Sequence, residues 1–363
     1  MPGPVLILGG YGNFGKRIAH GLTQHNIPIV IAGRSADKAT ALRQQLSRAD
    51  VQTACFDIDT GLDQAISNIH PSVVSHTCGP FQDRDYREAE CCIRQGVHYI
   101  DLADGREFVS GITRLGQQAR QRQIAVISGA STVPGLSSAV LEHIQPEFSR
   151  LDSLDYGISL GQKTERGLAT VQAILSYVGQ RLKPFPGDRG AAYGWQDLHR
   201  IHFPKLGRRW MANCDIPDLD LLPARYGIRS IRFSAGLESN VAHLGLWALS
   251  WVVRAGLSFN LSQLAKPLLS SSKRLDAFGS ANGGMHMQLK GIDQTGQPHM
   301  RTWFILAFNG HGPNIPTVPA VILAKKLAQA ETEITGATTC IGLVTLEEYL
   351  DELKHFDIET MLE

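Results

Sequence analysis

Three glycines near the start of the chain have the spacing of a phosphate-binding loop. Gly10, Gly12 and Gly15 form the pattern G-x-G-x-x-G after an apolar run and before a helical pattern. The first permits a tight turn, the second lets the backbone approach a diphosphate, and the third lets helix and strand pack closely. We expect the intervening Asn13 and Phe14 to contact the same ligand. The alternative is a glycine turn without a ligand.

A basic residue stands where such a site often has an acid. Arg34 follows the second apolar run, about 20 residues beyond the glycine loop, where a carboxylate would bind the ribose of NAD. A guanidinium there can make charge-assisted hydrogen bonds to the 2′-phosphate of NADP instead. Ser35 adds a hydroxyl and Lys38 adds charge. The sequence therefore predicts an NADP(H) site, with an ordinary surface arginine as the alternative.

The third apolar run ends at a carboxylate, Asp57. We expect it to lie near an adenine, where it could accept a hydrogen bond from the exocyclic amine. Capping of the next helix is an equally reasonable interpretation.

The segment after the fourth apolar run, HTCGPF, presents mainly backbone to a ligand. Cys78, Gly79 and Pro80 are expected to lie along the cofactor. Cys78 could be a redox nucleophile or a small packing residue, and no neighbour in sequence suggests an activated thiol. His76, just before this loop, is a candidate catalytic residue, although a strand histidine often simply packs.

The fifth apolar run ends in groups that could move a proton or bind a charge. Tyr99 and Asp101 are candidate proton relays, and Asp104 and Arg106 are candidate substrate ligands, with the guanidinium gripping a carboxylate. Alternatively, the two aspartates cap the next helix and the arginine is solvated.

Gly129 ends the sixth run and is another candidate cofactor contact. The pair His199-x-x-His202 has no matching ligand pattern, so no metal site is predicted.

The elements that must position these residues alternate regularly. Strand-like runs at 5–10, 28–34, 51–59, 72–79, 97–103 and 124–130 are separated by helical patterns. This alternation predicts an α/β fold with a Rossmann, doubly wound parallel sheet, and ligands then bind beyond the carboxyl ends of its strands.

The pattern changes after Gly129. Residues 151–161 and 286–308 alternate like strands, with a turn at 293–296, and all five tryptophans follow residue 190. We predict a dinucleotide-binding domain at 1–130, a mixed α+β substrate and dimerisation domain at 131–312, and a helical segment at 313–363 that returns to the first domain.

Composition excludes several classes of protein. The 35 basic and 34 acidic residues nearly cancel, and no basic–aromatic pattern suggests nucleic-acid binding. Six cysteines without a C-x-x-C pair, and no secretory leader, favour reduced thiols in the cytoplasm. The apolar segment 241–259 contains His243 and Arg254, so we expect a buried or interface helix, with a membrane-surface anchor as the weaker alternative.

The motifs together resemble a known family. GGYGNFGKRIA, AGRS, FDID, TCGPF, AECCIRQGVHYIDLADG and AVISGASTVPGLSS are similar, in this order, to the nucleotide domain of the saccharopine dehydrogenase family. The resemblance covers residues 4–145, and residues 146–310 follow the family only in outline.

The resemblance implies a nicotinamide cofactor on the first domain and a second domain that contacts substrate and often dimerises. It implies an oxidoreductase that transfers hydride to or from a C=N or C=O carbon of a small amine or amino-acid-like substrate. A catalytically silent NADP(H)-binding sensor or scaffold is the alternative.

Overall fold

The computed structural model describes residues 3–82, 84–187, 190–256 and 261–363. The chain divides into two compact units, one comprising Met1–Ala139 and Asn314–Glu352, the other Val140–Pro313 and Leu353–Glu363. Each unit is built on its own seven-stranded sheet.

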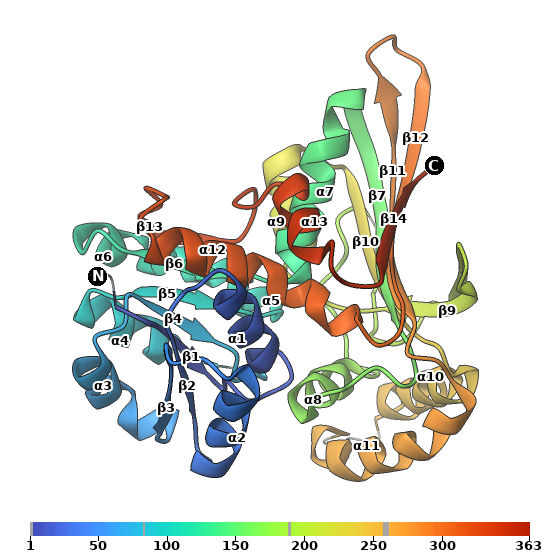
Figure 1. Ribbon diagram of the computed structural model, residues 1–363. Coiled ribbons are helices and arrows are strands. Elements are labelled where there is room, and N and C mark those ends of the chain that lie inside the picture. Colours follow the sequence, from blue (N-terminus) through green and yellow to red (C-terminus); the bar gives the residue numbers. More distant parts are fainter. Residues whose placement is uncertain (1–2, 83, 188–189, 257–260) are drawn as a thin grey trace. The chain divides into compact units, whose positions relative to one another are not determined.

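The first unit contains the predicted doubly wound sheet, in the order β13-β6-β5-β4-β1-β2-β3 (Figure 1). All of its strand pairs are parallel. The strands are β1 Val5–Leu8, β2 Ile29–Gly33, β3 Val51–Cys55, β4 Val73–His76, β5 His98–Asp101, β6 Ala125–Ser128 and β13 Gly336–Thr339. The order reverses between β1 and β4, so ligands are expected at the carboxyl ends beside this switch point.

In the described residues, eight α-helices that precede β13 belong wholly to this unit or begin in it. They are α1 Gly15–Gln24, α2 Ala36–Leu46, α3 Ile58–Ile69, α4 Arg87–Gln95, α5 Arg106–Gly111, α6 Gly116–Gln121, α7 Ser137–Ile144 and α12 Val318–Ala328. The helical pattern between β5 and β6 forms three pieces, namely α5, a 3₁₀ turn at Ile112–Leu115 and α6. Gly111 and Gly116 flank that turn, and glycine favours helix interiors least among residues other than proline.

The segment near the chain end supplies more than the expected helix. A short helix, α13 Leu346–Leu353, follows β13, and β13 adds to the first sheet beside β6 (Figure 1). Helix α12 packs on α1, where a Cβ on Gly21 would lie 2.8 Å from a methyl of Val321. The sequences of β13, GATT, and β14, IETML, lack the apolar runs that marked the equally short β1, β4, β5 and β6, so the sequence did not predict them.

The second unit has a mixed sheet in the order β14-β12-β11-β7-β10-β9-β8. Its strands are β7 Phe148–Leu160, β8 His199–Phe203, β9 Gly207–Asn213, β10 Ser230–Leu237, β11 Gly283–Asp293, β12 Pro298–Ala307 and β14 Ile358–Leu362. Its helices are α8 Leu168–Tyr177, α9 Asp218–Tyr226, α10 Asn240–Arg254 and α11 Ala265–Lys273. The predicted α/β fold with a second mixed α+β region is confirmed.

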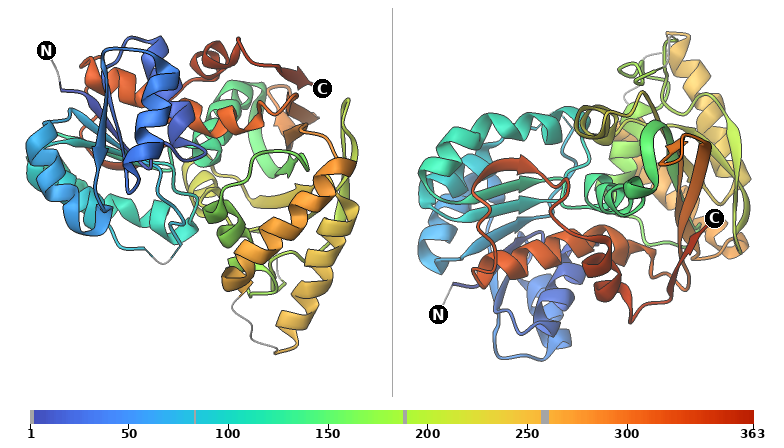
Figure 2. Two further views of the ribbon diagram at one scale, coloured as in Figure 1. Left: turned by 60° about the horizontal axis from the view of Figure 1, so that its bottom comes forward. Right: turned by 90° about the horizontal axis from the view of Figure 1, so that it is seen from above.

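Helix α10 covers most of the apolar segment 241–259, whose end at 257–259 lies outside the described residues. Ser239 caps it, and its inner side packs with α8 and α11, which lie beside it in Figure 2. Trp251 and Val241 on its outer side are exposed. None of the described helices has the length and hydropathy required to cross a bilayer.

Candidate cofactor and active site

The glycine loop leaves the start of α1 open to an anion. No side chain caps α1, so its first-turn N–H groups are not satisfied by a capping residue. A Cβ on Gly15 would lie 2.2 Å from the carbonyl oxygen of Gly9, and only glycine allows this approach of helix to strand. An uncapped helix start beside a close-packed glycine turn is suited to a diphosphate.

The turn after β2 carries the residues expected to select the cofactor. Arg34 and Lys38 are exposed, and Ser35 is partly exposed. Arg34 forms no hydrogen bond or ion pair with the described residues, so its guanidinium is available to a ligand. Ser35 also caps α2, because its Oγ accepts a 3.4 Å hydrogen bond from the N–H of Lys38. We refer to Arg34, Ser35 and Lys38 as the charged turn.

Asp57 follows the neighbouring strand β3 and caps α3. Its exposed carboxylate accepts a 3.0 Å hydrogen bond from the N–H of Asp59. The capping interpretation is therefore correct for the structure, and an adenine contact stays a prediction.

A second group of candidates lies on the other side of the switch point. His76 pairs with Asp101 between β4 and β5, and paired strand residues point to the same face of a sheet. Tyr99 shares this face, and its hydroxyl lies 2.9 Å from Nδ1 of His76. The three side chains are at most 1% exposed. We refer to His76, Tyr99, Asp101, Ser128 and Gly129 as the buried cluster.

Asp101 holds the buried cluster together. Its Oδ1 accepts hydrogen bonds from the Ala103 N–H at 3.0 Å and from the Ser128 hydroxyl and the Gly129 N–H at 2.9 Å each. Burial raises the carboxyl pKa to about 6, although these donors favour the charged form. Its Oδ2 makes no hydrogen bond of standard geometry with the described residues, although the Tyr99 hydroxyl is close enough to lower the carboxyl pKa. Asp101 thus combines a fixed oxygen with an unsatisfied one.

The side chains of His76 and Tyr99 in the buried cluster are held uncharged. Burial lowers the pKa of His76 to about 3 and raises the pKa of Tyr99 far above its usual value. Nε2 of His76 also lacks a hydrogen-bond partner within the described part of the chain. A neutral imidazole with one nitrogen bound to a phenol can still accept or donate a hydrogen bond at the other.

Cys78 packs against the glycine loop. A Cβ on Gly9 would lie 2.8 Å from the Cys78 sulfur. Burial raises the thiol pKa to about 11, so the thiolate needed by a redox nucleophile is scarce at neutral pH. The packing interpretation is therefore favoured for Cys78. Gly79 and Pro80 follow it, joined by a cis peptide bond.

The two candidate substrate ligands differ in accessibility. Asp104 is exposed and accepts a 3.1 Å hydrogen bond from the side-chain amide of Gln82. Arg106, at the start of α5, is only 3% exposed, which contradicts the solvated alternative. Asp104 is therefore the more accessible of the two.

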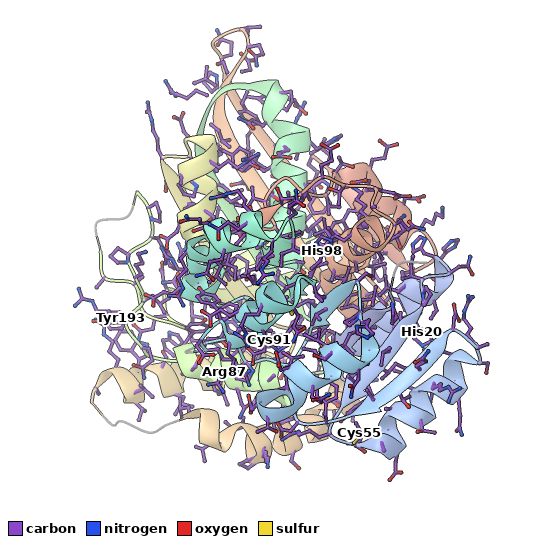
Figure 3. The ribbon with its side chains drawn as sticks, turned by 90° about the vertical axis from the view of Figure 1, so that its left-hand side faces the viewer. His20, Cys55, Arg87, Cys91, His98 and Tyr193 are labelled. Atoms are coloured by element: carbon purple, nitrogen blue, oxygen red, sulfur yellow. The ribbon has the colours of Figure 1, made fainter. Side chains whose placement is uncertain are left out.

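The opposite end of the same sheet shows how a structural histidine differs. His98, labelled in Figure 3, lies at the start of β5 and accepts a 2.9 Å hydrogen bond from the N–H of Ala125 at the start of β6. It links the two strands at the amino end of the sheet, away from the predicted ligand.

Sequence reasoning missed three contributors. Ser128 binds Asp101, Thr77 donates a 2.7 Å hydrogen bond to the Leu8 carbonyl beside the glycine loop, and Tyr11 extends from that loop to Gly33. Only the position of Tyr11 between two loop glycines could have signalled a role. In the described residues, no group of three or more His, Cys, Asp or Glu side chains could hold a metal ion.

Comparison with known proteins supports the nucleotide-binding interpretation. Residues 5–127 match the family model described as the saccharopine dehydrogenase NADP binding domain. No curated protein matches the sequence. The predicted resemblance of the nucleotide domain is confirmed, and with it the assignment of NADP as the cofactor of this domain.

Among solved structures, apo saccharopine dehydrogenase (L-Glu forming) from Saccharomyces cerevisiae is similar in fold. The TM-score is 0.68 at 12% identity, with 99% of this chain and 100% of that chain covered. An alignment with an amine dehydrogenase from Mycobacterium smegmatis covers 93% of this chain and 95% of that chain, at 11% identity. Its TM-score of 0.48 is too low to support a conclusion about fold or function. Because only 12% of the aligned residues are identical, the similarity to the yeast enzyme establishes the fold and not the activity.

Proposed function

We propose, on the premise that residues 5–127 match the saccharopine dehydrogenase NADP binding domain, that this chain is an NADP(H)-dependent oxidoreductase. The hydride would pass to or from a C=N or C=O carbon of a small amine or amino-acid-like substrate, with CH–NH donors as the preferred class. A bound nicotinamide supplies the hydride chemistry, and the protein supplies orientation and proton handling.

The observation that carries the proposal is the buried cluster at the carboxyl ends of β4, β5 and β6. Asp101 has one carboxylate oxygen for which the described residues provide no hydrogen bond of standard geometry, and a pKa of about 6, close to neutral pH. A group whose pKa lies near the working pH is suited to general acid–base chemistry. We propose that Asp101 exchanges the substrate proton, and that Tyr99 and His76 orient and relay.

The remaining predicted contacts complete the proposed site. Gly10, Gly12, Asn13, Phe14 and Gly15 would hold the diphosphate, and the charged turn would hold the 2′-phosphate. The loop of Cys78, Gly79 and Pro80, with Gly129, would lie along the nicotinamide ribose. Asp104 and Arg106 would contact substrate.

Burial of the same cluster favours a second candidate function. His76, Tyr99 and Asp101 are closed to solvent, so their network would also serve a protein that binds NADP(H) without turnover. In that case Asp101 only fastens the ends of β5 and β6.

Cofactor oxidation separates the two functions. NADPH absorbance would be followed with a panel of keto acids and aldehydes, each with and without amino acids or amines. An enzyme that acts on a C=N carbon should oxidise NADPH only when the carbonyl and amine partners are both present, and one that acts on a C=O carbon should oxidise it with the carbonyl alone. It should also show a rise in Tm with NADPH and a further rise with substrate, whereas a binding protein shows the first rise alone. No oxidation with any pair would contradict the enzyme.

We further propose that the chain forms a homodimer, as the family resemblance suggests. We also propose that it lies in a reducing compartment, as its cysteines suggest. All six cysteines are free, and Cys55, at the end of β3 in Figure 3, is exposed. Exposed free thiols are typical of reducing compartments. Light scattering of the purified chain would test the dimer, since a monomer mass contradicts it.

A further inference from the structure

Tyr11 connects the glycine loop to the charged turn. It stands between Gly10 and Gly12, and its ring lies against Gly33 at the end of β2. A Cβ on Gly33 would lie 2.5 Å from ring carbon Cε1 and 2.7 Å from the hydroxyl oxygen. Glycine at position 33 therefore makes room for the phenol.

The hydroxyl of Tyr11 has one identified partner. Its oxygen accepts a 2.9 Å hydrogen bond from the N–H of Ser35, which precedes α2. A phenol can donate one hydrogen bond as well as accept, and no described residue accepts from this hydroxyl. The Tyr11 proton is therefore free to reach a ligand beside Ser35.

Several donors thus surround one place at the end of β2. Arg34 is exposed and unpaired among the described residues, the Ser35 hydroxyl accepts from Lys38 and keeps its own proton, and Tyr11 adds a phenol. A phosphate offers only acceptors when ionised, so three donors at the end of one strand suit it. Acidic Asp37 stands in the first turn of α2 and makes these donors the more necessary.

We propose that Tyr11 determines cofactor specificity by donating a hydrogen bond from its hydroxyl to the adenosine 2′-phosphate. Through the Ser35 N–H, Tyr11 also fixes the turn from which Arg34 extends. This inference rests on the NADP(H)-binding part of the proposed function and is independent of hydride transfer.

Fragment binding tests this without catalysis. Calorimetry would give the Kd of 2′,5′-ADP, which carries the extra phosphate, and of 5′-AMP, which lacks it. Tyr11→Phe should weaken 2′,5′-ADP by about ten- to 150-fold, the range for a hydrogen bond to a charged group, and leave 5′-AMP within about twofold. Gly33→Ala should act in the same direction, because its Cβ displaces the phenol ring.

Tyr193→Phe is the matched control, since it removes a phenol hydroxyl from the second unit, at a residue labelled in Figure 3. It should bind both fragments as the wild type does. If Tyr11→Phe weakens the binding of both fragments equally, Tyr11 has only a structural role. That result would overturn the Tyr11 inference and leave the proposed NADP(H) binding in place. Failure of the wild type to prefer 2′,5′-ADP would overturn the NADP(H) assignment as well. If the fragments bind as expected but no hydride transfer is found, only the proposed oxidoreductase activity is overturned.

Discussion

The charged turn and the buried cluster lie at the carboxyl ends of strands on either side of β1 in one sheet, yet they are built on opposite principles. The side chains of Arg34 and Lys38 are exposed to water. Asp101 and His76 are withdrawn from water, and burial shifts the pKa of each toward its neutral form. The first region can recognise a fixed charge, and the second can exchange a proton.

The largest effect is expected where the buried cluster loses its acceptor. Asp101→Ala leaves the N–H groups of Ala103 and Gly129 and the hydroxyl of Ser128 without their partner. At about 1–3 kcal/mol for each orphaned buried donor, the free energy of unfolding should fall by roughly 3 kcal/mol or more. Urea unfolding monitored at constant pH measures this loss.

Asp101→Asn is the matched control, because its amide oxygen can replace Oδ1 as the acceptor. It should cost clearly less than the alanine variant. An alanine variant that unfolds within about 0.5 kcal/mol of the wild type, as an ordinary surface substitution would, contradicts the role of Asp101.

The charged turn should respond through binding instead of stability. Arg34→Asp replaces an attraction for the 2′-phosphate with a repulsion, so we expect NADPH to bind at least about tenfold more weakly while NADH affinity is kept. Because the guanidinium is exposed, salt should reduce the wild-type preference for NADPH. Calorimetry at low and high ionic strength measures both effects, and unchanged NADPH affinity in the variant would remove Arg34 from the site.

Acid should affect the buried cluster through His76. Its pKa falls from 6.5 in the unfolded chain to about 3 in the fold, so the unfolded state gains a proton first and stability falls as pH drops below about 6.5. Asp101 acts oppositely, because its folded pKa of about 6 exceeds the ordinary 3.8 and stability rises as pH drops from about 6 to 4. His76→Asn should leave only the Asp101 contribution and so flatten the acid loss.

Urea midpoints at pH values on both sides of this window measure the difference between variant and wild type. His70→Asn, at an exposed helix end, is the control for removing a histidine. Identical pH slopes for wild type and His76→Asn would show that His76 is not buried in its neutral form.

The smallest effect is expected at Cys78, which lies between the two regions. Cys78→Ser should change NADPH binding by less than about twofold, because the thiol only packs on Gly9. Its pKa of about 11 also predicts slow alkylation at neutral pH, after the exposed Cys55. Mass spectrometry of a timed iodoacetamide reaction checks this order, and rapid labelling of Cys78 would indicate an activated thiol.

Local patterns predicted the parts of the fold that local physics determines. Gly10, Gly12 and Gly15 lie within six positions of one another, and the alternation of strands and helices in the first unit repeats at short range. Ser35 and Gly96 mark helix ends for the same reason, because capping depends on nearby backbone.

Contacts between distant positions could not be predicted in this way. Asp101 binds Ser128 and Gly129 from the next strand, and Tyr11 binds Ser35 from the previous loop. The residue types suggested a relay at Asp101, but only the strand register shows that His76 lies opposite it. The burial of Arg106 also depends on packing that no short segment encodes.

Strand β13 has a consequence for how the protein is made. It covers the edge of β6, and the N–H of Cys340 donates a 2.9 Å hydrogen bond to the Ser128 carbonyl. β13 can therefore pair with β6 only after the ribosome has synthesised residues 140–313, which lie between these two strands in the sequence. Until then β6 presents an open edge on a nascent chain, the kind of surface on which chaperones act and aggregation begins.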